Sequence, residues 1–166
     1  MDKKHKFLLS NHIVLCFLSV VMILFFCSGF IVGNENITGF QLLTFPNGDL
    51  VATTLSVAVV FFLVGLTINV IISFCLFLSD FEIIEEPKTL DMLEKLLVIM
   101  TTIILNLSFV ILICLKLKTS QLNRGESSLN QLGIGGVINF VFSIVIFLQS
   151  IALKFADKID FDKNIK

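Results

Sequence analysis

The longest uncharged apolar stretch of the chain, residues 55–78, limits what the protein can fold into. Its 24 residues, LSVAVVFFLVGLTINVIISFCLFL, include no charge and no proline. As an α-helix that rises ~1.5 Å per residue, the stretch would be ~36 Å long, and the hydrocarbon core of a bilayer is ~30 Å thick. The sequence therefore predicts a helix that crosses a membrane, with the preceding chain on one side and Asp80 onward on the other.

Three further stretches have the length and composition of a membrane span. The predicted spans are residues 7–32, 55–78, 96–115 and 134–153, joined by loops at 33–54, 79–95 and 116–133 and followed by a tail at 154–166. Only 15% of the residues are charged, whereas soluble domains carry about 25%. We expect a single all-α membrane domain over residues 1–166, folded as an antiparallel bundle of four transmembrane helices. The first apolar run is longer than the core of a signal peptide, so we expect it to be retained.

The lysines and arginines predict how the chain is threaded. Three lie before the first span, two in the second loop and four in the tail, whereas the first loop has none and the third has three. Positive charges favour the cytoplasmic side, so both termini are predicted to be cytoplasmic. The charges of the third loop oppose this assignment. Three spans plus a cleaved or re-entrant segment would be the competing arrangement.

Small and amide side chains recur within the spans at helical spacing. Two spans carry a Gly, an Asn and a Ser spaced i, i+4, i+8, which places all three on one face. In lipid, small residues let backbones approach closely, and amides form hydrogen bonds between helices. The candidates for helix packing are Gly65, Asn69, Ser73, Asn106, Gly135, Asn139 and Ser143. We expect close helix contacts at the two glycines, and we expect the three asparagines to point into the bundle.

Chemistry inside a membrane needs titratable or metal-binding groups at depth. From Ile13 onward the spans contain no Asp, Glu or His, and His5 and His12 lie at the start of the first span. The four cysteines lie in apolar runs without CxxC spacing and are expected to be structural. We therefore predict no catalytic residue, no cofactor and no metal site. The net charge of −1 offers no basic face for nucleic acid.

Two loops each leave two interpretations open. The first loop is partly apolar, with Phe40, Leu42, Leu43 and Phe45, and either packs back on the helix ends, which we favour, or forms a docking surface. The second loop carries six acidic residues. If it is helical, Glu82, Glu85 and Glu86 could form a patch for a cation or a basic partner, although a solvated linker is the favoured interpretation.

Two short stretches of the first helix and loop are Ser28-Gly29-Phe30 and residues 37–43, which have the sequence ITGFQLL. In these stretches the chain resembles small uncharacterised four-span membrane proteins of low-GC Gram-positive bacteria. The resemblance covers mainly residues 7–60. It implies a multi-pass protein of the bacterial plasma membrane and supplies no site residue.

Small size and the absence of a catalytic group favour a non-catalytic interaction protein of the accessory, scaffold or immunity type. Its expected partners are the lipid bilayer and a larger membrane complex or a second copy of itself. The alternative is a subunit of a small oligomeric channel or transporter, because an oligomer could line a pore with the amides of Asn69, Asn106, Asn139 and Gln149.

Overall fold

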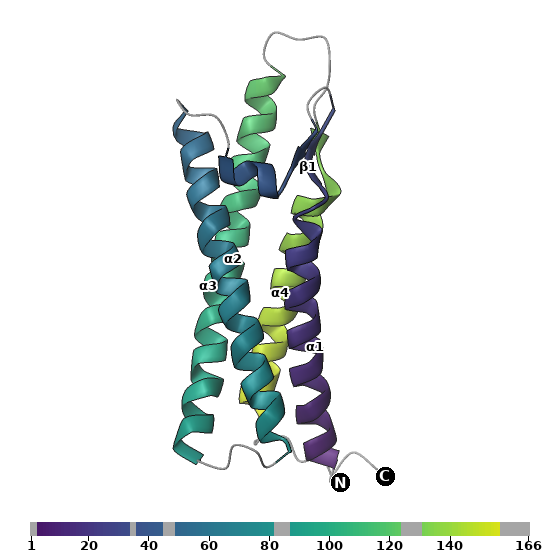
Figure 1. The fold of residues 1–166 in the computed structure, drawn as a ribbon, viewed down its shortest axis with the longest axis vertical. Coiled ribbons are helices and arrows are strands. Elements are labelled where there is room, and N and C mark those ends of the chain that lie inside the picture. Colours follow the sequence, from purple (N-terminus) through teal and green to yellow (C-terminus); the bar gives the residue numbers. More distant parts are fainter. Residues whose placement is uncertain (1–2, 34–35, 45–48, 82–86, 124–130, 157–166) are drawn as a thin grey trace.

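Four long helices lie side by side along one axis and alternate in direction (Figure 1). They are α1 (Lys3–Phe25), α2 (Leu50–Ser79), α3 (Pro87–Leu122) and α4 (Ile134–Lys154). The structure is a computed structural model that describes residues 3–33, 36–44, 49–81, 87–123 and 131–156. All four helices are long and apolar enough to cross a membrane, which confirms the prediction of four apolar helices. In the bundle, α2 packs against α1 and α3, and α4 packs against α3 and α1.

The first helix ends earlier than the predicted span at 7–32. It stops at Phe25, a tight turn follows in which the Cys27 and Ser28 N–H groups donate three residues back, and β1 (Gly29–Val32) begins. Hydropathy alone cannot separate a short apolar strand from the last turn of an apolar helix. The other three helices start at or before the predicted spans and end after them, most of all α3, which polar residues extend at both ends.

A small cap closes the end of the bundle where α1 ends and α2 begins (Figure 1). Its antiparallel sheet has the order β2-β1-β3, with β2 at Ile37–Thr38 and β3 at Gln131–Leu132. The 3-10 helix η1 (Phe40–Thr44) packs against α2. Ile37 and Leu42 are buried, so this part of the first loop packs back on the helix ends, as the favoured interpretation expected. Phe45 lies outside the described residues.

Aromatic side chains join the cap to the bundle. Phe26 is fully buried, and its ring centroid lies 5.1 Å from that of Phe30, 5.9 Å from that of Phe40 and 5.8 Å from that of Phe62. The four rings come from the turn after α1, from β1, from η1 and from α2. Aromatic pairs at such separations stabilise a fold by about 0.5–1.5 kcal/mol each beyond their buried area, so the cap and the helices form one core.

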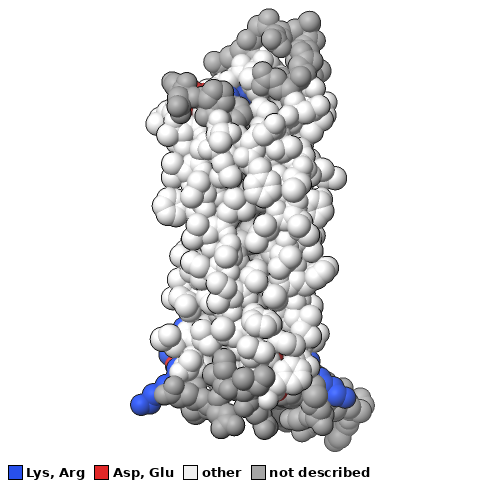
Figure 2. All heavy atoms as spheres, viewed as in Figure 1, with Lys and Arg blue, Asp and Glu red and all other residues white. Residues whose placement is uncertain are grey.

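The outer surface between the two ends of the bundle is apolar. The charged side chains visible in Figure 2 lie at the two ends, and the band between them is uncharged on the face shown. Large hydrophobic side chains on that surface are well exposed, including Phe17, Leu24, Phe61 and Leu148. An apolar surface of this extent marks a membrane or protein contact rather than a surface adapted to water.

Candidate functional site

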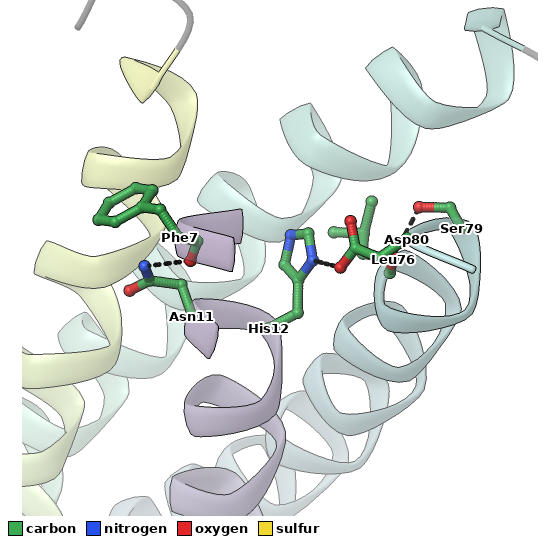
Figure 3. Close-up of polar contacts among 6 residues, drawn as sticks. All are labelled: Phe7, Asn11, His12, Leu76, Ser79 and Asp80. Carbon is green, nitrogen blue, oxygen red and sulfur yellow. Dashed lines mark hydrogen bonds and ion pairs between the residues drawn. The ribbon is translucent and has the colours of Figure 1, made fainter. Parts of the chain in front are cut away.

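A buried ionisable pair joins α1 to α2 at the end of the bundle opposite the cap. His12 Nδ1 lies 2.8 Å from Asp80 Oδ2, and the two side chains are only 5% and 8% exposed (Figure 3). His12 comes from the first half of α1, and Asp80 directly follows the last residue of α2. Because the two helices run in opposite directions, the beginning of one meets the end of the other.

Asp80 also ends α2. Its backbone N–H donates to the carbonyls of Leu76 and Phe77, and the Ser79 hydroxyl donates to Leu76 at 2.6 Å (Figure 3). A carboxylate at this position faces the negative end of the helix dipole, which disfavours it. In the tautomer that carries a proton on Nδ1, His12 donates to the Asp80 carboxylate. The hydrogen bond from His12 therefore offsets the unfavourable position of Asp80.

Within the described residues, the hydrogen-bonding groups beside Asp80 other than His12 belong to α2 itself. A histidine held by a carboxylate acts as a base only beside a nucleophile, a metal or a bound substrate group. The nearby Ser79 hydroxyl is committed to a backbone carbonyl of its own helix. In the part of the chain that the structure describes, no three His, Cys, Asp or Glu side chains gather closely enough to hold a metal ion. The geometry is that of a polar link between two helices.

Two further polar links lie deeper in the bundle. Asn69 of α2 donates from Nδ2 to the Ser19 hydroxyl of α1 at 2.8 Å, and Ser19 in turn donates to the Leu15 carbonyl. Between α3 and α4, the hydroxyls of Thr101 and Ser150 are 2.7 Å apart. All four side chains are buried. Within hydrocarbon such bonds are worth about 0.6 kcal/mol on average, so the links align helices more than they stabilise them.

The predicted glycine contacts occur at different partners. A Cβ added to Gly65 would lie 3.2 Å from Cγ1 of Ile104, which places Gly65 against α3. A Cβ added to Gly135 would lie 2.8 Å from the Phe30 ring. The absence of a side chain at Gly135 therefore lets Phe30 of β1 pack closely against α4, whereas the sequence predicted a contact between two helices. The neighbouring Gly136 faces the Leu115 side chain of α3.

The other predicted packing residues divide into buried and exposed positions. Asn69, Ser73, Asn139 and Ser143 are buried. Asn139 and Ser143 donate to carbonyls of their own helix rather than to a neighbouring helix. The prediction that Asn106 points into the bundle is wrong, because Asn106 is exposed on the outer face of α3. The reason is angular: Leu97, Thr101, Ile104 and Ser108 face inward, which turns Asn106 outward.

Sequence reasoning missed His12, Ser19, Thr101 and Ser150 as partners. The sequence did contain a signal for His12, because an antiparallel pair of spans brings the start of one span and the end of the next to the same membrane surface. His12 and Asp80 occupy those two positions. The hydroxyl residues carried no comparable signal, because serine and threonine occur on all sides of an apolar helix. The acidic patch of Glu82, Glu85 and Glu86 lies outside the described residues.

A second ion pair fixes the cap end of α2 to the end of α3. Asp49 caps α2 by accepting from the Val51 N–H at 3.1 Å, and Lys118 Nζ lies 3.4 Å from its other oxygen. The Val51 hydrogen bond, and after it Lys118, hold the pKa of the Asp49 carboxyl below its ordinary value, against an opposing effect of partial desolvation. Asp49 is therefore ionised at neutral pH and holds both helix ends.

Comparison of the chain with protein-family models, with curated proteins and with solved structures gave no significant match.

Proposed function

We propose that the chain is a multi-pass protein of a bacterial plasma membrane that acts without catalysis, as an accessory, scaffold or immunity-type protein that binds other membrane proteins. Both termini are cytoplasmic in this proposal, in accord with the distribution of Lys and Arg. The resemblance of residues 7–60 to four-span proteins of low-GC Gram-positive bacteria favours the same placement.

The observation that carries the proposal is the filled interior of the bundle. Large apolar side chains with no exposed surface occupy it along its length, and they come from all four helices: Leu15, Met22, Phe62, Leu66, Ile104 and Ile146. A transport path through a single chain would need polar or wet lining along its length. The interior therefore supports the fold, and the surface is left for function.

A subunit of an oligomeric channel or transporter is the second candidate. It is favoured by buried polar atoms that have no hydrogen-bond partner among the described residues, namely Asn69 Oδ1, Ser73 Oγ, Asn139 Oδ1 and Gln149 Oε1. Such atoms in a dry interior are costly, at about 1–3 kcal/mol each, and a wet path would relieve that cost.

Purification in a mild detergent separates the two candidates. The accessory role predicts that a larger membrane protein co-purifies in fixed stoichiometry and that proteoliposomes of the chain alone show no ion flux. A chain that purifies alone and conducts ions in proteoliposomes would establish the channel candidate instead.

Reporter fusions test the threading independently. Fusions after Leu43 should report an extracytoplasmic position, and fusions after Glu86 and Lys163 a cytoplasmic one. An extracytoplasmic signal from the Lys163 fusion would overturn the four-span arrangement.

A further inference from the structure

The amide of Asn106 lies on the outer surface at the middle of α3. The uncharged part of that helix, residues 96–115, is 20 residues long, or ~30 Å at ~1.5 Å per residue. Asn106 is therefore ~15 Å from either end, at the depth of the bilayer centre. Its Nδ2 donates to the Thr102 carbonyl at 2.9 Å, and the described part of the chain supplies no donor to its Oδ1.

Lipid tails cannot satisfy this group. An amide in an apolar environment is costly unless its hydrogen bonds are made. Thr67, which is also exposed on an outer face, avoids this cost because its hydroxyl donates to the Leu63 carbonyl of its own helix. Among the described residues of the four predicted spans, Asn106 is the only amide side chain that is exposed. An external partner with both a donor and an acceptor would satisfy it.

Apolar side chains continue the same line along α3 on both sides of Asn106. The α3 stripe consists of exposed residues spaced alternately four and three apart: Met92, Leu96, Ile99, Ile103, Asn106, Val110, Ile113 and Leu117. This is the 3.5-residue period of a seam between two supercoiled helices. The outer faces of the other helices have similar spacing, as in Ile13, Phe17, Val20 and Leu24 of α1, but no exposed amide. The amide distinguishes α3.

A second copy of the chain matches this surface by symmetry. Two copies inserted the same way run their α3 helices parallel, and a two-fold axis along the membrane normal brings identical residues to identical depth. Asn106 then faces Asn106. An amide offers both N–H donors and an oxygen acceptor, so each side chain supplies what the other lacks. The branched and linear apolar residues of the stripe likewise face their own counterparts.

We propose that two copies associate in the membrane through the α3 stripe, with the Asn106 amides paired across the two-fold axis. The inference rests on the membrane placement proposed above and is independent of the accessory role. It also assigns a purpose to an asparagine that does not contribute to the interior of the single chain.

Energy transfer between fluorescently labelled full-length chains in phosphatidylethanolamine and phosphatidylglycerol vesicles tests the proposal. The readout is the association constant from serial dilution into lipid. Asn106→Leu should weaken association by roughly 3- to 8-fold, the range expected for one to two hydrogen bonds of average strength in a membrane. Asn106→Gln, which keeps the amide, should retain most of it. Thr67→Leu removes a polar group from the outer face of α2 and should leave association unchanged.

Every outcome of these measurements either supports or overturns the proposed contact between α3 helices. Wild-type association in Asn106→Leu, or an equal loss in Thr67→Leu, would overturn the α3 contact. A wild-type chain that is monomeric at every dilution would overturn self-association, while its resistance to carbonate extraction would leave the membrane placement intact. A chain that carbonate extracts would refute both. Circular dichroism and thermal unfolding of each variant separate loss of association from loss of fold.

Discussion

Removal of His12 and removal of Asp80 are predicted to have unequal effects. The pair is more than nine-tenths buried, with an Nδ1 to Oδ2 distance of 2.8 Å. His12→Leu leaves a buried carboxylate without its donor, beside the negative end of α2. A buried charge that is left uncompensated when its partner is removed costs about 3–5 kcal/mol, and the helix dipole acts in the same direction.

Asp80→Leu leaves an imidazole N–H unpaired, which costs about 1–3 kcal/mol, and it removes a charge that the helix dipole disfavours. We therefore expect His12→Leu to lower the free energy of unfolding by roughly 2 kcal/mol more than Asp80→Leu, as the difference of these two ranges. The double variant should cost less than the sum of the two single variants, because neither side chain then remains unpaired.

The assay is equilibrium unfolding of the purified chain in detergent, for the wild type, both single variants and the double variant. Asn11→Leu is the matched control, since Asn11 precedes His12 but donates to the Phe7 carbonyl of its own helix (Figure 3). It should cost less than about 1 kcal/mol, the typical net value of one hydrogen bond. Equal effects of the two single variants, or strict additivity in the double variant, would refute the reasoning.

Four further predictions use the same unfolding measurement. Gly133→Ala should destabilise the fold by about 1–3 kcal/mol, since its Cβ would overlap the Gly29 carbonyl oxygen. Gly65→Ala should cost less than Gly133→Ala, because its Cβ would lie 3.2 Å from Cγ1 of Ile104, a side-chain atom that can shift where backbone cannot, and because alanine favours the helix. Asn69→Leu should cost about 0.6 kcal/mol, and a loss several times larger would point to a polar network instead. Asp49 has a lowered pKa in the folded state, so its stabilisation is present above the unfolded pKa of about 4 and is lost as pH falls through the folded value. Asp49→Asn should therefore be less stable at neutral pH and lose less stability on acidification; an unchanged acid response would contradict this.

The four apolar helices could be predicted from the sequence because the bilayer sets both the length and the composition of a span. The end of α1 could not, since Phe30 and Ile31 of β1 are as apolar as the helix before them. The start of α3 could be predicted, because proline favours the first turn of a helix, and α3 begins at Pro87. The hydropathy of a segment indicates whether it can span a membrane, but it does not indicate the residues at which the helix begins and ends.

The direction of each polar side chain was harder to predict than its presence. In a soluble helix the apolar face marks the core, but in these helices the outer face is as apolar as the inner one. Asn69 and Asn106 therefore look alike in the sequence, although one donates to Ser19 inside the bundle and the other lies on the outer surface. Only the packing of the neighbouring inward residues decides between them.

The order of the strands in the cap has a consequence for how the chain is assembled during synthesis. The central strand β1 pairs with β2, a few residues downstream, and with β3, which lies about a hundred residues further along the chain. One edge of β1 therefore stays open until α2 and α3 have both been made and Leu132 has emerged. An open edge of this kind can pair with any other extended chain. Once β3 has paired with β1, this edge is covered, and the nascent chain can no longer pair with its neighbours through it.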